Sequence, residues 1–244
     1  MIRIVTDSAA DLTARDLETP GVTVVPMGIT FADGTATVDD GSMTKDEFFT
    51  RLAEDSKLPR TSQPSPASFI ELFEEAADAG DEVIVITVAQ KLSGTYQCAS
   101  LAAAETDAKV YIIDSETATQ GEAIIVREAI RLREQGLSAS RIAAELETFK
   151  KRVRVVAIVD SLKHLQKGGR LPAAVAIVGG ALGIKPVLAL FDGAFEGRFH
   201  DPDVFLVVID QVVDGQRCGQ PFFQQRPPEA GADVELSAHT HVAP

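Results

Sequence analysis

Short runs of Val and Ile alternate with amphipathic segments of helical length along the first two thirds of the chain. Runs that are apolar at almost every position are typical of strands covered on both faces, as in a parallel sheet between layers of helices. The strands are expected at residues 2–5, 22–26, 82–88, 109–113 and 154–159. Strands that alternate with helices of about 10 to 15 residues predict an α/β fold built on a parallel sheet.

The expected helices carry recognisable start and stop signals. Ser65 followed by Pro66 is typical of an N-cap with proline at the first helical position, and Gly80 marks the end of that helix. Its apolar stripe, spaced i, i+3, i+4 and i+7, consists of Phe69, Leu72, Phe73 and Ala76. Two more helices are expected at residues 121–135 and 139–151.

The pattern changes near residue 155, so we expect two domains. An N-terminal α/β domain would span residues 1–155, and a smaller C-terminal α/β domain would span residues 156–244, shortened or irregular after residue 197. The elements expected in the second domain are a short helix at 160–166, a small-residue helix at 171–183, a strand at 185–191 and a helix at 204–213.

Composition excludes several classes of function. The formal net charge is −13, aromatic residues make up 6% of the chain and Trp is absent. Binding a phosphate backbone requires positive charge, and stacking on bases requires aromatic side chains. We therefore expect no nucleic-acid partner. Cys98 and Cys218 lie 120 residues apart without a Cys or His cluster, which predicts neither a disulfide framework nor a structural zinc site.

No segment of the sequence is typical of a targeting peptide or a membrane span. The N-terminus runs from three apolar residues directly into Asp7, unlike a signal peptide. The longest uncharged stretch, residues 171–184, has 14 residues and is broken by proline and glycines, too short to cross a bilayer. We therefore expect a cytoplasmic protein without stable membrane insertion.

Hydroxyl-rich turns follow the expected strands, whereas the common phosphate-loop, nucleophile-elbow and HExxH signatures are absent. Ligands of parallel sheets bind at the carboxyl ends of the strands, where such turns meet. Ser93, Gly94 and Thr95 follow a strong strand and precede a helix, so free N–H groups there favour an anion. Simple N-capping is the alternative for each turn. The turns lie at residues 6–8, 61–65, 92–95 and 114–115.

Other polar residues allow two interpretations each. Ser8 and Asp11 have the spacing of a capping-box variant, which explains the pair without a metal. His239 and His241 would share one strand face and could chelate a metal, although, with no third ligand in sight, two solvent-facing histidines are the better explanation. Arg170, after two glycines, is a candidate for binding an anion or a partner, or else a solvated loop residue.

The same turns are similar to the motifs of a known family. The sequence resembles the DegV family of bacterial fatty-acid-binding proteins, with the motifs in the family's order and spacing from residue 1 to about residue 197. The matching segments are Thr6-Asp7-Ser8-Ala9-Ala10-Asp11-Leu12, Thr61-Ser62-Gln63-Pro64-Ser65-Pro66, Leu92-Ser93-Gly94-Thr95-Tyr96-Gln97, Asp114-Ser115, Lys167-Gly168-Gly169-Arg170-Leu171, Gly183-Ile184-Lys185-Pro186-Val187 and Asp192-Gly193.

The resemblance implies two α/β domains with one long-chain, palmitate-like fatty acid in a tunnel between them. It places the fatty-acid carboxylate on Thr61 and Ser93, with secondary contacts from Ser62, Gly94 and Thr95. It also places Arg170 at the pocket mouth, where a partner docks, and His241 near the carboxylate. In the family a separate fatty acid kinase phosphorylates the bound acid, so the resemblance implies a lipid carrier without catalytic residues, metal or cofactor.

The chain departs from the family pattern after Gly197, where the family continues with a basic segment and runs some tens of residues longer. A rival hypothesis is a serine-dependent acyl hydrolase or transferase, with Ser93 as nucleophile, His241 as base and Asp114 as the residue that orients it. A kinase subunit is a third, because the family's fold resembles that of dihydroxyacetone kinase, but no nucleotide loop supports it.

Overall fold

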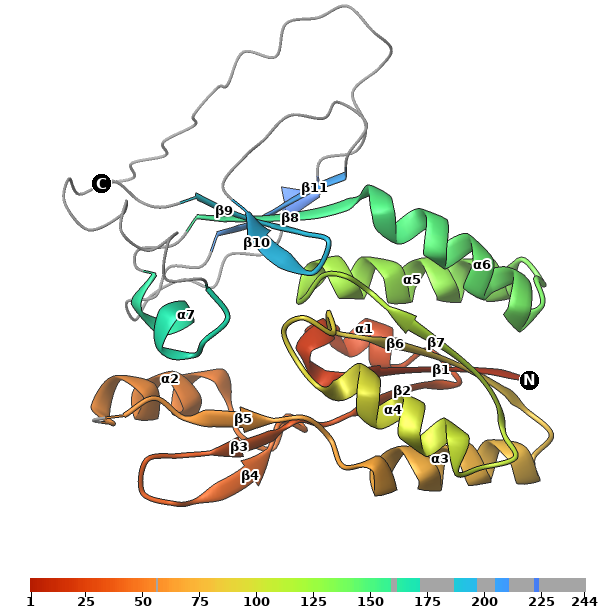
Figure 1. Ribbon diagram of the computed structural model, residues 1–244, viewed down its shortest axis with the longest axis horizontal. Helices are drawn as coiled ribbons and strands as arrows, with labels where there is room; N and C mark the ends of the chain where they lie inside the picture. The colour runs from red at the N-terminus through yellow and green to blue at the C-terminus, as the bar shows by residue number, and fades with distance from the viewer. Residues whose placement is uncertain (56, 159–161, 172–186, 197–204, 211–221, 224–244) are drawn as a thin grey trace, which may run out of the picture.

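The computed structural model describes the chain except for residues 56, 159–161, 172–186, 197–204, 211–221 and 224–244 (Figure 1). Its first sheet has four strands in the order β2-β1-β6-β7, and all neighbouring strands are parallel. The strands are β1 (Ile2–Asp7), β2 (Val22–Val25), β6 (Glu82–Thr87) and β7 (Lys109–Asp114). The predicted parallel sheet of an α/β fold is confirmed.

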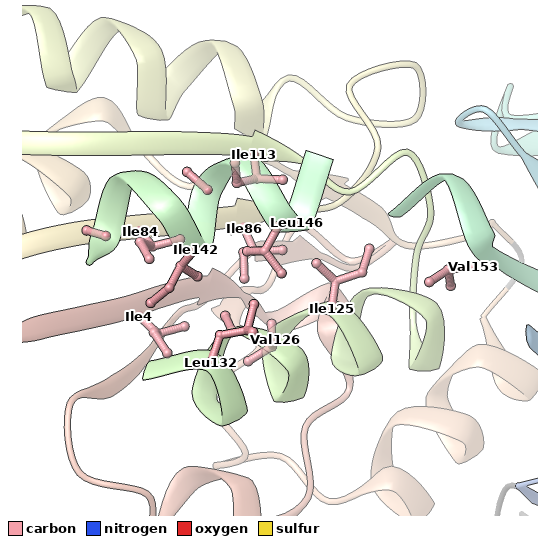
Figure 2. Packing of buried hydrophobic residues seen from close by; sticks show 13 residues of the cluster. Ile4, Ile84, Ile86, Ile113, Ile125, Val126, Leu132, Ile142, Leu146 and Val153 are labelled. Atoms are coloured by element: carbon pink, nitrogen blue, oxygen red, sulfur yellow. The ribbon is translucent and has the colours of Figure 1, made fainter. Parts of the chain in front are cut away.

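Helices cover both faces of this sheet, which explains the continuous apolar runs. On one face, α3 (Pro66–Asp78) and α4 (Thr95–Ala104) pack Phe69, Phe73 and Cys98 against Val83 and Val85. On the other face, α5 (Gln120–Glu134) and α6 (Ala139–Phe149) pack on the strand isoleucines; the labelled side chains of Figure 2 show this second core. Successive residues of one strand thus point into the two different cores. A strand with polar residues at every second position would therefore not fit between them.

The signals predicted for α3 are confirmed. The Ser65 hydroxyl accepts a hydrogen bond from the N–H of Ser68, and Pro66 occupies the first turn. Gly80 follows the helix with φ of +69°, a left-handed conformation that costs glycine least. Phe69, Phe73 and Ala76 are fully buried, as their spacing predicts.

A small antiparallel unit was not predicted. Its strands are β3 (Gly28–Thr30), β4 (Ala36–Val38) and β5 (Arg60–Ser62), in the order β4-β3-β5. Helix α2 (Lys45–Glu54) belongs to the same region, and the short α1 (Ala14–Leu17) precedes β2. Strands of three residues with exposed side chains carry too little hydrophobic periodicity to be recognised.

The second sheet has the order β10-β9-β8-β11-β12. Strand β8 pairs antiparallel with β9 and parallel with β11. In Figure 1, α5 and α6 lie between the two sheets. The strands are β8 (Val153–Ile158), β9 (Val187–Phe191), β10 (Ala194–Glu196), β11 (Phe205–Asp210) and β12 (Phe222–Phe223). The domain boundary at residue 155 stays a prediction, although β8, which crosses it, pairs within this second sheet.

One expected element is wrong. The helix expected at residues 204–213 is instead strand β11 (Phe205–Asp210). Asp201-Pro202 looks like a helix start, but the six residues of β11 are rich in β-branched side chains and pair with β8. The short helix α7 (Lys163–Lys167) is close to the one expected, and residues 172–183 of another expected helix lie outside the described residues.

Among the residues that the structure describes, no helix is both long and apolar enough to cross a membrane.

Candidate functional site

Two carboxylates hold the loop that follows β6. Asp7, fully buried at the end of β1, accepts hydrogen bonds from the N–H of Val88 (2.9 Å) and the N–H of Ala9 (3.0 Å). Asp114, at the end of β7, accepts hydrogen bonds from the N–H of Gln90 (3.1 Å) and the N–H of Glu116 (3.0 Å). The loop from β6 to α4 is therefore fixed by its backbone at the carboxyl edge of the sheet, where ligands of parallel sheets bind.

The expected capping-box pairing of Ser8 with Asp11 is wrong. Asp7 caps the short 3-10 helix that begins at Ser8, while the Ser8 hydroxyl accepts a hydrogen bond from the N–H of Met27 at 3.1 Å. Asp11 instead adopts φ of +48° and lies near Lys45. The Ser8 hydroxyl thus joins β1 to the start of β3 rather than capping a helix.

The loop ends at Ser93, Gly94 and Thr95, where α4 begins. The hydroxyls of Ser93 and Thr95 share a hydrogen bond of 2.9 Å, and Thr95 is fully buried. Gly94 is the N-cap and offers no side-chain hydrogen bond to the first turn. Helix N-termini carry partial positive charge and spare N–H groups, so this end of α4 suits an anion. The half-buried Ser93 Oγ also accepts the N–H of Thr95 at 3.4 Å, which is the capping contact that was the alternative for this turn.

Thr61 and Ser62 lie on opposite faces of β5. Ser62 is paired with Gly28 and its hydroxyl lies against the Gly28 backbone, where any side chain on residue 28 would clash with it. Thr61 is paired with Ile29, on the alternate face of the strand. Thr61 lines a cavity of about 1280 Å³ between the antiparallel unit and the segment around α7. Thr61 is thus placed for a ligand in this cavity, whereas Ser62 faces the strand beside it.

The walls of this cavity combine apolar and cationic side chains. Ile29, Phe31, Phe48 and Leu52 come from β3, the turn after it and α2. Cations outnumber carboxylates among the other lining residues, which include Lys45, Lys57, Arg60, Lys167 and Arg170 against Asp11 and Asp39. In a chain of net charge −13, such a group of cations next to an apolar wall favours a ligand with an anionic head and an apolar body.

Arg170 connects this cavity to the loop that carries Ser93. Its Nε donates a hydrogen bond to the carbonyl oxygen of Leu92 at 3.2 Å, and its Nη1 donates to Gly168 at 2.6 Å. The residue is exposed, so its guanidinium borders solvent as well as the cavity. Arg170 is thus held at the cavity edge by two backbone carbonyls, and its role in binding an anion or a partner stays a prediction.

Gln63 connects the segment of Thr61 to the turn of Ser93. Its side-chain amide packs on Gly94, and its Nε2 donates to the Sγ of Cys98 at 3.5 Å. Thus the structure brings together two predicted segments that are some 30 residues apart in the chain. Sequence analysis did not single out Gln63, because the contact depends on a tertiary neighbour that spacing does not reveal.

A second feature that sequence analysis missed is a buried carboxyl pair. Glu122, in the first turn of α5, is fully buried and accepts a hydrogen bond from the Thr6 hydroxyl at 2.9 Å. Burial raises the pKa of Glu122 well above its usual value, and the nearby Asp7 charge adds to that shift. Burial likewise raises the pKa of Asp7 to about 6, against the lowering by the N–H groups of Val88 and Ala9.

The remaining candidates bear on metal and hydrolase chemistry. His239 and His241 lie outside the described residues, within which no group of three or more metal-ligating side chains gathers. The Asp114 carboxylate, proposed to orient a catalytic base, accepts backbone N–H groups through its Oδ1. The Ser93 hydroxyl is engaged with Thr95. The hydrolase hypothesis therefore gains no support from the described geometry.

Comparison with known proteins places these features in a family context. A model of the DegV family, described as uncharacterised, matches residues 1–197. A DegV domain-containing protein of Caldanaerobacter subterraneus is 38% identical over 193 residues, which cover 79% of this chain and 68% of that protein.

Solved structures agree with this match. A fatty acid (stearic acid)-binding protein of Eubacterium ventriosum superposes with a TM-score of 0.75 at 33% identity, covering 82% of this chain and 70% of that one. A DegV family protein of Thermus thermophilus, described by its fatty-acid binding, gives a TM-score of 0.73 at 36% identity, covering 81% and 70%. For DegV of Bacillus subtilis, described as a fatty acid binding protein, the TM-score is 0.71 at 32% identity, with coverage of 80% and 69%.

Proposed function

The chain belongs to the DegV family, and on this premise we propose that it binds one long-chain fatty acid and carries it without transforming it. The solved relatives described as fatty-acid-binding proteins support this proposal. The observation that carries it is the start of α4, where Ser93 and the N-cap Gly94, which has no side chain, lie beside Gln63 of the segment that carries Thr61. In this proposal the carboxylate is bound by neutral donors, of which Thr61 lines the apolar-walled cavity and Ser93 lies on the loop to which Arg170 of that cavity is bonded.

In the proposed complex, Thr61 and Ser93 donate hydrogen bonds to the carboxylate. The backbone at Gly94 contributes the charge of the helix N-terminus, Thr95 holds the Ser93 hydroxyl, and Ser62 is a weaker contact. A carboxylate that leaves water must be hydrogen-bonded, because an unpaired buried charge costs several kcal/mol or more. Neutral hydroxyls and N–H groups meet that requirement without adding a buried cation.

The acyl chain supplies most of the affinity in this proposal. A palmitate-like chain of about 14 methylenes would gain roughly 11 kcal/mol at about 0.8 kcal/mol for each buried CH₂, before the costs of binding are subtracted. The polar contacts then set the orientation of the acid and supply the smaller part of the affinity. A weakened head-group site is therefore expected to bind lipid still, but less tightly and with poorer selection for the free acid.

We further propose that the bound carboxyl group is presented in the cytoplasm to a separate fatty acid kinase. Thr61 and Arg170 are both exposed, which supports a head group that a partner can reach. Arg170, held at the Leu92 carbonyl, is the proposed contact at the pocket mouth, and His241 is proposed to lie near the carboxylate. The carrier itself needs no metal or cofactor for this role.

The proposal is tested by titrating palmitate into wild-type protein and into Thr61→Ala, Ser93→Ala and the double variant. Each single change should weaken binding about tenfold, the size expected when one hydrogen bond to a charged group is lost. Ser62→Ala is the matched control and should lose less, because that hydroxyl faces Gly28. Unchanged affinity and chain register in the double variant would refute the head-group assignment. Turnover of a p-nitrophenyl ester that vanishes in Ser93→Ala would instead support the hydrolase.

A further inference from the structure

Gln63 belongs to the segment of Thr61 and contacts Gly94 and Cys98 at the start of α4, without being one of the proposed hydroxyl donors. We propose that Gln63 is a positioning residue that, seated on Gly94, sets the separation of the Thr61 and Ser93 hydroxyls and thereby the preference for a free carboxylate. This inference rests on the proposed function, because it concerns how that same site selects its ligand. It assigns to Gln63 no direct contact with the fatty acid.

The absence of a side chain at Gly94 makes the contact feasible. A Cβ on Gly94 would lie 2.8 to 2.9 Å from the Oε1, Cδ and Nε2 atoms of Gln63, closer than real Cβ contacts come. The backbone of Gly94 has φ of −79° and ψ of 7°, which any residue can adopt. A side chain on residue 94 would therefore have to displace the Gln63 amide, which is the end of a flexible side chain, whereas the conformation of the turn itself does not require glycine.

Cys98 fixes the direction in which the amide points. The Nε2 of Gln63 donates to the Cys98 Sγ at 3.5 Å, and Cys98 is buried. The N–H of Cys98 in turn donates to the carbonyl of Gly94 at 3.0 Å, one turn earlier in α4. The amide thus lies along the first turn of α4, with its nitrogen toward the sulfur and its whole plane over Gly94.

The place of Gln63 in the chain connects this contact to the ligand donors. It follows Thr61 by two residues, and Gly94 directly follows Ser93. Thr61 and Ser62 are held by pairing with Ile29 and Gly28 of β3. The exposed Gln63 follows the end of this pairing and precedes the buried Pro64. The seat on Gly94 is the contact that couples the position of Thr61 to the start of α4. Loss of that coupling would let the two hydroxyls drift apart, since a misplaced donor forms a poorer hydrogen bond.

A double-mutant cycle tests the proposal. Palmitate and its methyl ester are titrated into wild type, Gln63→Ala, Gly94→Ala and the double variant, with thermal unfolding recorded for each. Each single change should weaken palmitate binding about tenfold and methyl-ester binding less than about twofold, because the ester lacks the charge that the aligned donors recognise. The double variant should be no weaker than either single one, since Gly94→Ala acts by displacing the Gln63 amide.

Matched variants separate positioning from folding. Gln97→Ala removes an exposed glutamine from the first turn of α4, the helix that Gln63 contacts. It should leave the affinities for palmitate and for its methyl ester unchanged. Gln63→Asn keeps the amide but shortens its reach, so it should behave like Gln63→Ala at wild-type stability.

Additive losses in the cycle, or equal losses for the acid and the ester, would overturn the positioning role. A wild-type protein that binds neither ligand would refute the proposed function itself, and the inference with it.

Discussion

At the scale of single residues, the most unusual groups are the buried carboxyls of Asp7 and Glu122, near the loop from β6 to α4. Asp7 is fully buried and holds the N–H groups of Val88 and Ala9, so its charged form is useful to the loop but expensive in free energy. Glu122, also fully buried, lies close enough for the two charges to repel each other. The chain thus gives up stability at neutral pH to fix the loop that precedes Ser93.

This pair predicts a specific pH dependence of stability. Because the pKa of Asp7 is raised from 3.8 to about 6 in the folded state, the folded chain binds more protons than the unfolded chain between these values. The contribution of Asp7 to the free energy of unfolding therefore falls as pH rises from about 4 to about 6, by up to about 3 kcal/mol, and is flat above. Asp7→Asn should reduce this fall in urea unfolding measured at about pH 4 and about pH 7. Removing the Asp7 charge also lowers the pKa of Glu122, which acts in the same direction. An equal pH effect in both proteins would contradict the account.

At the scale of elements, close packing of α5 against β8 holds the two sheets together. A Cβ on Gly121 would lie 2.6 Å from a methyl carbon of Val155 and would also clash with the Thr117 side chain. Gly121 is in the first turn of α5, and Val155 is in β8 of the second sheet. Glycine at residue 121 thus lets α5 approach β8 closely, at some cost in helix propensity.

Gly121→Ala tests which of these two effects is larger. The alanine should gain about 1 kcal/mol of helix propensity but lose about 1 to 3 kcal/mol through overpacking, so the variant should be less stable than wild type. The loss should shrink in part in a Val155→Ala background, because the Val155 methyl is then gone while the still closer Thr117 hydroxyl remains. Denaturant unfolding of the four proteins measures both effects. A Gly121→Ala chain at least as stable as wild type would show that α5 and β8 are not closely packed.

The same scale shows what the sequence could and could not predict. Strands β1, β6 and β7 were predictable because burial on both faces requires an apolar residue at almost every position. The three-residue strands β3, β4 and β5 lack that requirement, since much of their surface is exposed. Strand β11 was mistaken for a helix because a local start signal was given more weight than its β-branched run.

At the scale of the whole molecule, a turn of the second sheet contacts the loop from β6 to α4, which belongs to the first sheet. The N–H of Gly193, in the turn between β9 and β10, donates to the carbonyl of Glu116 at 2.7 Å, and Lys91 Nζ donates to the carbonyl of Asp192 at 2.7 Å. Gly193 has φ of +73° and approaches Ala89, so a side chain there would be both strained and crowded. The loop before Ser93 is thus held by Asp7 and Asp114 of the first sheet and by this turn of the second sheet.

The candidate site was only partly predictable at this scale. The hydroxyl turns at residues 61–65 and 92–95 could be identified, because strands of a parallel sheet end at one edge. That Gln63 joins them through Gly94, and that Ser62 turns away toward Gly28, depends on tertiary contacts between distant segments. Likewise, a Glu in the first turn of a helix is ordinary in sequence, so the burial of Glu122 had no signal of its own.

The central claim, that this chain carries a long-chain fatty acid, is tested most directly by the lipid that the purified protein contains. Wild-type chain is denatured and extracted, and the extract is quantified against protein by mass spectrometry. The account predicts one saturated or unsaturated long-chain fatty acid for each chain, released only on denaturation. An extract without fatty acid, together with no uptake of added palmitate, would contradict it.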